Sequence, residues 1–284
     1  MMTQAQMEEG MAYAEDNFQN EHAQHLHMDK QLIRQLFDLR GKKVLDFGCG
    51  MGGMTLWYAT HWPCEVHGVD IDRHHIAIAQ QLQAKHQVQN VRFEQRNILA
   101  DPLTGLYDLI FMNDVAEHIP YPVLTDILAQ FTKLLAPGGK VFLTFPPWAG
   151  PFSSHLYHRI RIPWSQFLPK RILLPMIERV NHPLVGVDES DLKSAWFGLN
   201  RLTYRKLDKV RQATGLQLEK RRSHCRLNRW PLLRSIPFHA TPFYFLVSKE
   251  FVTLTGEGME QVPVRVNKKA GKKLERAEER LKRV

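Results

Sequence analysis

The chain of 284 residues is long enough for one large domain, and its 44% apolar and 24% charged residues are typical of a folded globular protein. This composition excludes a largely disordered or collagen-like chain, and three widely separated cysteines exclude a disulfide framework or a CxxC zinc site. The net charge of +9 is uneven, because residues 1–200 carry 17 Lys/Arg against 21 Asp/Glu while residues 201–284 carry 21 against 8. Such a basic C-terminal part either attracts polyanions or forms a solvated basic face.

The sequence shows no segment that directs export or membrane insertion. No apolar stretch approaches the ~18 residues that a membrane-spanning helix needs. Residues 1–20 are polar and acidic, whereas a signal peptide is basic and then apolar. We therefore expect a cytoplasmic protein.

Residues 42–145 alternate β-branched runs with amphipathic stretches, which predicts successive βα units and a parallel sheet. A helix over 20–39 is expected to precede this sheet. Pro137-Gly138-Gly139 is predicted to end the last helix of the region, since proline cannot continue a helix and glycine adopts the left-handed ending conformation. The predicted strands are 43–47, 65–70, 91–95, 107–113 and 140–145, and the predicted helices are 54–61, 73–86 and 122–135.

The regular pattern stops after Phe145 for about fifty residues rich in Pro, Trp and His. Loops of this length usually have structure of their own or cover a substrate, so we expect 146–200 to be an inserted substrate lid. A helix at 202–214, strands at 216–222 and 241–248, and a charged helix at 268–284 are expected to follow. These boundaries predict a main domain over 1–249, with a helical cap at 1–40, and a basic tail over 250–284.

An apolar strand at 43–47 leads into a glycine-rich turn at 48–53. Glycine lets the backbone turn sharply near a ligand, and the following helix N-terminus offers unpaired N–H groups. Asp70, about twenty residues on, ends the next strand, where a carboxylate can accept both hydroxyls of a ribose. Nicotinamide and adenosyl cofactors both suit this arrangement. The glycine spacing departs from GxGxxG, and Asp46 would repel a pyrophosphate, so an adenosyl cofactor with a cationic amino acid is favoured.

From Val44 to about Phe145 the sequence resembles the class I S-adenosylmethionine-dependent methyltransferases. Segments 46–52, 70–71, 107–118 and 134–143 are similar to four family motifs in the family's order, while Asn97 replaces the usual Asp. The resemblance implies an α/β, doubly wound, Rossmann-like fold whose seven-stranded sheet is mostly parallel with an antiparallel last strand. It also implies S-adenosyl-L-methionine as cofactor, bound by Asp46, Gly48, Gly50, Gly52, Asp70, Ile71, Asn97, Ile98, Asn113 and Asp114.

Asp114, Glu117 and His118 follow the fourth predicted strand with i, i+3, i+4 spacing. On one helical face they could hold a divalent cation, and a similar pattern occurs in quinone-precursor O-methyltransferases. Such clusters more often form hydrogen-bonded structure, so we assign no metal ligand from the sequence. Asp114 is also a candidate to face the methionine end of the cofactor.

The candidate catalytic bases are His118, His155 and His158. The lid that contains His155 and His158 begins at the carboxyl end of the fifth strand, where parallel sheets carry their ligand crevice. Unperturbed imidazole titrates near ~6.5, so either side chain could deprotonate a hydroxyl. The alternative for both is simple packing within the lid.

Two surfaces suggest partners. Segment 159–176 mixes Trp, Phe and Leu with Arg and Lys, as an element lying against anionic lipid would, although an ordinary packed lid has the same composition. The basic residues of the C-terminal part could instead contact RNA phosphates. RNA is disfavoured, because no RNA-binding module and no Asp/Asn-Pro-Pro-Tyr motif is present. The basic residues concerned are Lys220, Arg221, Arg222, Arg226 and Arg229.

We therefore interpret the chain as an S-adenosylmethionine-dependent enzyme that O-methylates a small-molecule, lipid-linked or glycan acceptor. An RNA methyltransferase and a non-catalytic cofactor-binding partner protein are the alternatives. Peripheral contact with the inner membrane face is part of the first hypothesis.

Overall fold

The computed structural model describes residues 2–22, 26–181, 191–233, 236, 238 and 242–256. The side chains of Tyr157, His158, Arg229 and Pro231 are outside this description, as is the helix expected at 268–284. None of the helices in the described ranges combines the length and apolar character that crossing a bilayer requires.

A seven-stranded sheet forms the centre of the molecule, with strand order β3-β2-β1-β4-β5-β7-β6. The first five strands are mutually parallel, and β7 is antiparallel to both of its neighbours, β5 and β6. This arrangement confirms the predicted fold class. The strands are β1 (Lys43–Phe47), β2 (Glu65–Asp70), β3 (Val91–Gln95), β4 (Tyr107–Asn113), β5 (Leu135–Phe145), β6 (Gln217–Cys225) and β7 (Val247–Thr255).

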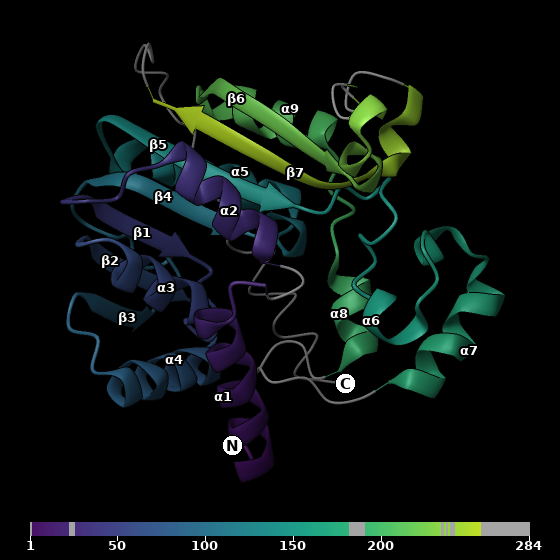
Figure 1. Cartoon of the computed structure of the whole chain (residues 1–284), viewed down its shortest axis with the longest axis horizontal. Helices are drawn as coiled ribbons and strands as arrows, with labels where there is room; N and C mark the ends of the chain where they lie inside the picture. The colour runs from purple at the N-terminus through teal and green to yellow at the C-terminus, as the bar shows by residue number, and fades with distance from the viewer. Residues whose placement is uncertain are drawn as a thin grey trace.

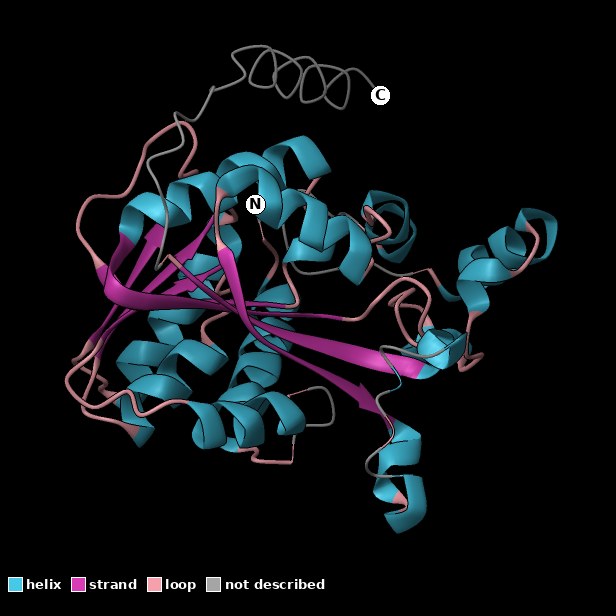
Figure 2. Ribbon diagram, turned by 90° about the horizontal axis from the view of Figure 1, so that it is seen from above, coloured by secondary structure: helices cyan, strands magenta, loops and turns pink. Residues whose placement is uncertain are grey.

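Helices cover both faces of the sheet (Figure 2), as buried apolar strands require. One face packs against α1 (Gln4–Gln19), α2 (His27–Leu36), α3 (Gly53–His61) and α4 (Arg73–His86), which share a core that includes Ile33, Trp57 and Ile78. The other face packs against α5 (Tyr121–Leu134) and α9 (Tyr204–Thr214), through Leu128, Phe131 and Leu207 among others.

The segment between β5 and α9 extends to one side of the sheet (Figure 1). It contains α6 (Tyr157–Ile160), α7 (Lys170–Val180) and α8 (Leu192–Gly198). Its own small apolar core joins the start of α6 to α7 and α8, so the segment is more than an extended loop. The buried members of this core are Leu156, Leu173, Ile177, Leu192, Trp196 and Leu199.

Three expectations about the elements were wrong in detail. The helix expected at 20–39 begins only at His27, and a separate helix, α1, precedes it. Helix α5 ends at Leu134 and the backbone is already extended at Leu135, so Pro137-Gly138-Gly139 lies within β5. The last strand is Val247–Thr255 instead of 241–248, which places 250–255 inside the sheet and not in the tail.

Candidate active site

The glycine-rich turn between β1 and α3 is fixed by two close approaches. Gly48 has φ +71°, and a Cβ there would lie 2.6 Å from a methyl group of Val115. Gly52, with φ +81°, caps α3, and a Cβ there would lie 2.7 Å from both Ala79 and Phe93. Side chains are therefore excluded at both positions. The first contact also places the turn after β4 directly over the glycine turn.

Gly50 differs from these two glycines because the space beside it is open. A Cβ on Gly50 would meet no atom within 4 Å, although its φ of +52° also favours glycine. Its N–H donates to the Asp70 carboxylate at 2.8 Å. The turn therefore exposes backbone to a ligand at this point while tying it to the end of β2.

Asp70 holds the glycine turn and still has acceptor capacity. One oxygen binds Gly50 N and the other binds Asp72 N at 2.9 Å, which uses about two of the roughly four lone-pair sites of a carboxylate. Burial alone favours the neutral acid, but the facing His75 and these N–H groups hold the pKa of Asp70 below its ordinary value. An ionised carboxylate at this place can accept ribose hydroxyls.

Asp46 lies beneath the turn, 3% exposed, and accepts a hydrogen bond from Thr55 Oγ1 at 2.6 Å. Burial raises the pKa of this carboxyl to about 7, and the nearby Asp70 acts in the same direction. A cation bound near it would favour the ionised form. This environment suits a positively charged ligand.

The residues predicted to contact an adenine lie next to Asp70, because β2 and β3 are neighbours. Arg96 N donates to Asp70 O at 2.9 Å, which brings Asn97 and Ile98 alongside. Asn97 Oδ1 accepts from Leu99 N at 3.1 Å, and Ile98 is buried. Ile71 is 53% exposed, an apolar surface on which a planar base can pack.

Asn113 ends β4 with one free acceptor. Its Nδ2 donates to the Tyr58 hydroxyl at 2.7 Å, while its buried Oδ1 accepts no hydrogen bond from the described residues. A buried acceptor of this kind is costly unless a ligand or water supplies a donor. Asn113 is therefore well placed for a ligand with N–H or O–H groups.

Asp114 forms an ion pair with a lysine that the sequence did not indicate as its partner. Its Oδ2 binds Lys249 Nζ at 2.6 Å, and the same ammonium binds Asp29 of α2 at 2.7 Å. Asp114 has φ +53°, which is unusual for a residue other than glycine. Asp114 is not part of the cluster formed by Glu117, His118 and His155, although its spacing had made a shared helical face conceivable. Lys249 and Asp29 were missed because they lie far from every motif.

Helix α1 lies against the glycine turn, which the sequence also did not indicate. A Cβ on Gly53, the first residue of α3, would lie 2.6 Å from Asn17 and 2.7 Å from the Ala14 carbonyl. In Figure 1 this helix runs beside α3 and α4, both of which it contacts. The first helix of the chain is therefore part of the wall of the site.

Glu117, His118 and His155 come together at the turn after β4, whose Val115 approaches the glycine turn. One side-chain atom of each lies within 4.8 Å of the other two, and His155 Nε2 is 3.6 Å from Glu117 Oε1. The rings of His118 and His155 meet edge to face with centroids 4.9 Å apart. The sequence identified both histidines as candidate bases, but the pairing of His155 with Glu117 depends on the fold of the segment after β5.

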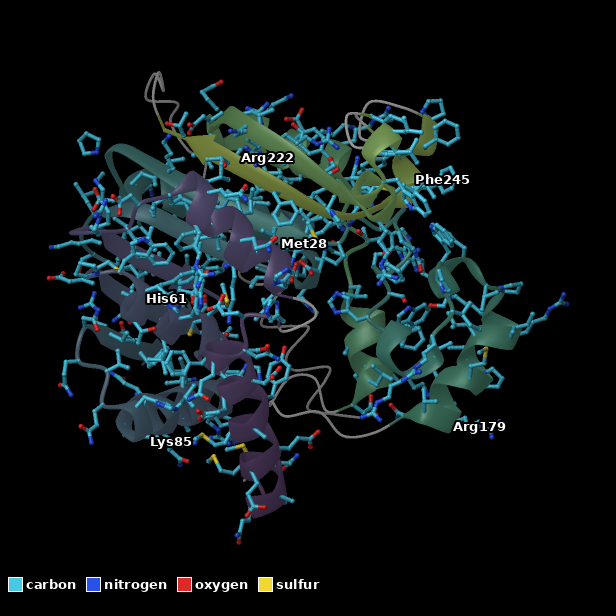
Figure 3. The ribbon with its side chains drawn as sticks, in the orientation of Figure 1. Met28, His61, Lys85, Arg179, Arg222 and Phe245 are labelled. Carbon is cyan, nitrogen blue, oxygen red and sulfur yellow. The ribbon has the colours of Figure 1, made fainter. Side chains whose placement is uncertain are left out.

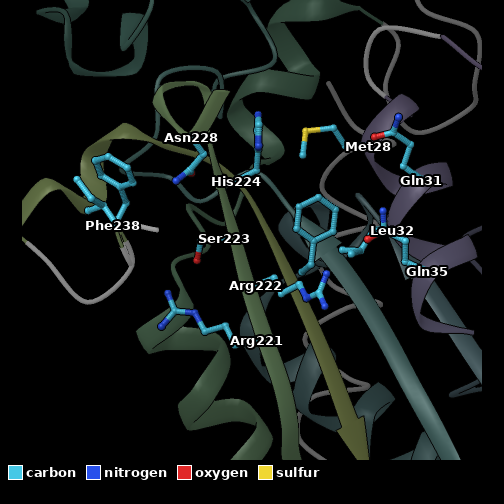
Figure 4. A pocket seen from close by; sticks show the side chains of 12 residues that line it. Met28, Gln31, Leu32, Gln35, Arg221, Arg222, Ser223, His224, Asn228 and Phe238 are labelled. Atoms are coloured by element: carbon cyan, nitrogen blue, oxygen red, sulfur yellow. The ribbon is translucent and has the colours of Figure 1, made fainter. Parts of the chain in front are cut away.

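A separate cavity of about 400 Å³ lies between α2 and the β6–β7 edge of the sheet, where Met28 and Arg222 face it from opposite sides (Figures 3 and 4). It is lined by none of the residues predicted to bind cofactor. Arg221, one of the basic residues that could contact RNA phosphates, also lines this cavity. Its guanidinium binds the buried Glu250 at 2.6 Å. The charge of Arg221 is therefore paired within the sheet, with Glu250 of β7.

A model of a methyltransferase domain family matches residues 20–187, more than half of the chain. The chain belongs to this family. It therefore contains a methyltransferase domain. The residues fit the S-adenosyl-L-methionine expected from the sequence. Gly50 leaves open space beside the ionised Asp70, Ile71 offers an apolar surface next to it, and Asn113 has an acceptor that receives no hydrogen bond from the described residues.

The methyltransferase is similar to curated ubiquinone biosynthesis O-methyltransferases. It is 34% identical to that of Nitrosococcus oceani over 116 residues, which are 40% of this chain and 48% of the relative. It is also 34% identical to that of Acinetobacter baumannii strain ACICU over 108 residues, which are 37% and 44% of the two chains. The matched part thus spans about half or less of each relative's length.

Solved structures with the same fold have much lower sequence identity. A geranyl diphosphate methyltransferase in complex with GPP and sinefungin is 15% identical, with a TM-score of 0.53 and coverage of 81% of this chain and 77% of that one. The PH0226 protein of Pyrococcus horikoshii OT3 is 16% identical, with a TM-score of 0.51 and coverage of 84% and 95%. These likenesses establish the fold alone.

Proposed function

We propose that this methyltransferase transfers the methyl group to a hydroxyl oxygen of a small-molecule acceptor. The observation that carries this proposal is the imidazole of His155 beside the turn after β4, which packs on the glycine turn. A hydroxyl must lose its proton to become a good nucleophile. His155 faces the buried Glu117 on one side and is 30% exposed on the other. The names of the curated relatives support the same reaction type.

The cofactor supplies an electrophilic methyl group on a sulfonium sulfur. The chain's own residues bind it through the glycine turn, Asp70 and Asn113, and hold the acceptor in line with the methyl carbon. His155 accepts the acceptor's proton, and the ring of His118 packs against it. His158 remains a predicted second base, because its side chain lies outside the described part of the chain.

The segment 146–200 is proposed to act as the substrate lid. Its small core makes it a folded unit, and it brings His155 to Glu117 and His118 after β4. Closing such a unit over the acceptor would exclude water and complete the reacting geometry. This proposal keeps the predicted division between a main domain and an inserted lid.

The outer surface of this segment supports a lipid-linked acceptor and contact with anionic membrane. Phe167 is 58% exposed and Ile172 47% exposed, next to cationic Lys170 and Arg171. Trp164 donates to the Phe245 carbonyl at 3.0 Å, so the exposed Phe245 of the β6–β7 connection adjoins the lid (Figure 3). Exposed aromatic and aliphatic groups among cations are typical of an interfacial surface.

Methyl-labelled S-adenosylmethionine, incubated with the protein and cell extract, tests the reaction. Label in an alkali-stable ether of the lipid or small-molecule fraction is expected, and label in RNA or protein would contradict the proposal. His155→Ala should reduce transfer by about 10²-fold or more while cofactor affinity stays unchanged. His86→Ala, which removes an imidazole at the far end of α4, is the matched control.

Sedimentation with vesicles tests the membrane contact separately. The protein should pellet with vesicles containing anionic phosphatidylglycerol and less so with neutral phosphatidylcholine. Phe167→Ser should weaken this binding without lowering transfer to a soluble acceptor. Equal binding to both vesicle types would contradict an anionic lipid surface.

A further inference from the structure

Glu117 is a buried carboxylate without a hydrogen-bond donor. It lies in the short turn Ala116–His118 between β4 and α5, and its side chain is 4% exposed. Neither oxygen accepts a hydrogen bond from the described residues. Burying such a group costs several kcal/mol unless a partner compensates it, so its position calls for an explanation.

His155 is the partner that faces this carboxylate. Its Nε2 lies 3.6 Å from Glu117 Oε1, slightly beyond hydrogen-bond distance, and a shift of ~0.7 Å would bring the two atoms into a normal hydrogen bond. Catalytic hydrogen bonds are often long before substrate binds and shorten in the complex. His155 is 30% exposed, so part of its side chain faces outward from Glu117.

Asn200 holds the turn that carries Glu117, and the backbone of His155 has an unusual conformation. Asn200, at the end of the lid, donates its N–H to the Glu117 carbonyl at 2.8 Å and its Nδ2 to the Ala116 carbonyl at 2.7 Å. Its Nδ2 also donates to the Ile119 carbonyl at 2.6 Å. His155 has φ +57°, a conformation that costs free energy and is found mainly where surrounding structure enforces it. The lid is therefore anchored on the very turn that carries Glu117.

We propose that Glu117 is the positioning residue for His155 in the methyl transfer, an inference that rests on the proposed function. The carboxylate accepts the Nε2–H of His155, which fixes the tautomer whose Nδ1 lone pair faces the acceptor hydroxyl. The hydroxyl proton passes to Nδ1 as the oxygen bonds to the methyl carbon, and the electron pair of the broken C–S bond stays on sulfur. Glu117 then stabilises the imidazolium.

Asp114 cannot take this role, although it precedes Glu117 by only three residues. Its carboxylate is engaged by Lys249 at 2.6 Å, on the side of the crevice formed by α2 and β7. The two carboxylates after β4 thus have different partners and different tasks. Asp114 binds the ammonium of Lys249, whereas Glu117 faces the imidazole of His155.

The tautomer of His155 tests the proposal without any acceptor. In protein with ¹⁵N-labelled histidine rings at pH 8, the His155 signals are those absent from His155→Asn. We expect the Nε2–H form alone in the native protein, whereas in Glu117→Leu the smaller share of Nδ1–H that a free neutral imidazole has should appear. Leucine suits this test because it has a similar size and no polar atom, and because the facing His155 is 30% exposed, so that no fully buried partner is left behind. A dominant Nδ1–H form, or no change in Glu117→Leu, would overturn the proposal.

Kinetics with the acceptor identified in the labelling experiment test the catalytic consequence. Glu117→Gln should lower kcat by about 10²-fold or more with KM and cofactor affinity within twofold, and Glu117→Gln combined with His155→Asn should be no worse than His155→Asn alone. Asp126→Asn, which neutralises a partly buried carboxylate of α5, is the control and should leave kcat unchanged. An unchanged kcat in Glu117→Gln would overturn the proposal.

Two further results separate this inference from its alternatives. Micromolar Zn²⁺ or Mg²⁺ that shifts the ring signals of both His118 and His155 would show that the cluster holds a cation, and would overturn the proposal. A tautomer fixed by Glu117, together with methyl transfer to nitrogen or carbon acceptors only, would contradict the proposed O-methylation while upholding the Glu117–His155 pair.

Discussion

Replacing Lys249 by methionine should destabilise the methyltransferase strongly. Lys249 is 12% exposed and lies between Asp29, which is fully buried, and Asp114. Although burial alone favours the neutral amine, these two carboxylates hold the pKa of Lys249 above its ordinary value. Removing one member of a buried ion pair costs about 3–5 kcal/mol, because the remaining charge has no partner. At about 2–4 °C per kcal/mol for a domain of this size, Tm should fall by roughly 6–20 °C.

The loss should depend on pH in a predictable direction. Burial already raises the pKa of Asp29 to about 6 despite Lys249, so the folded chain keeps a proton that the unfolded chain has lost. Stability from this group is therefore present at low pH and decreases as pH rises from about 4 to about 6. Without the ammonium the folded pKa of Asp29 rises further, so the decrease extends to higher pH. The difference in Tm between the native protein and Lys249→Met should be smaller at pH 5 than at pH 8.

Thermal unfolding followed by circular dichroism at both pH values measures this effect. Lys140→Met is the matched control, because Lys140 pairs with Glu219 at 2.6 Å on the same sheet with both side chains 38% exposed. An exposed pair of this kind contributes about 0–1 kcal/mol. Asp29→Asn should recover part of the stability lost in Lys249→Met. Equal, small losses in the two lysine variants would refute the reasoning that burial makes the difference.

Three other predictions concern the cofactor site. Asp70→Ala should weaken cofactor binding, measured by calorimetry, by about 10- to 100-fold, because a charged acceptor is lost. Replacing the exposed Asp101 by alanine is the control and should leave the affinity unchanged. Equal affinities of the two variants would refute the assignment of Asp70 to the ribose. Cofactor affinity should be about tenfold weaker at pH 6 than at pH 8. The reason is that burial raises the pKa of Asp46 to about 7, so this carboxyl is mostly protonated at pH 6. Asp46→Asn should abolish the difference between the two pH values. Gly48→Ala should lower Tm more than Gly105→Ala, since both have positive φ but only Gly48 has a neighbour within 4 Å of the added Cβ.

Hydrophobic patterning predicted the parallel half of the sheet closely. Strands β1 to β4 match the expected boundaries residue for residue, because each is a short apolar run bounded by polar or glycine-containing turns. The last strand was misplaced because Lys249 and Glu250 interrupt its apolar pattern. In the structure both are buried, Lys249 with two carboxylates and Glu250 with Arg221. Prediction from sequence patterns assumes that charged residues lie on the surface, and this assumption is wrong for charged residues that are paired inside the protein.

Helix α1 could have been predicted from a local sequence signal, whereas the site residues Asp29 and Lys249 are brought together only by the tertiary fold. Helix α1 begins with a capping box between Thr3 and Gln6, a short-range signal that the sequence contained. The partners of Asp114 could not be found in this way, since Asp29 and Lys249 are separated by 220 positions. The pairing of Glu117 with His155 likewise depends on how the inserted segment folds back. The motif residues predict where cofactor binds, but they do not predict which side chains surround the acceptor.

The position of β7 has a consequence for how the chain folds during its synthesis. This last strand in sequence lies between β5 and β6 in the sheet, so β6 leaves the ribosome before its neighbour exists. Until residues 247–255 emerge, β5 ends the sheet with an open edge, β6 is unpaired, and Asp114 lacks its cation. Open edges of this kind recruit other strands and promote aggregation. A nascent or truncated chain that stops before β7 should therefore depend on chaperones, even though every cofactor-binding motif has already been made.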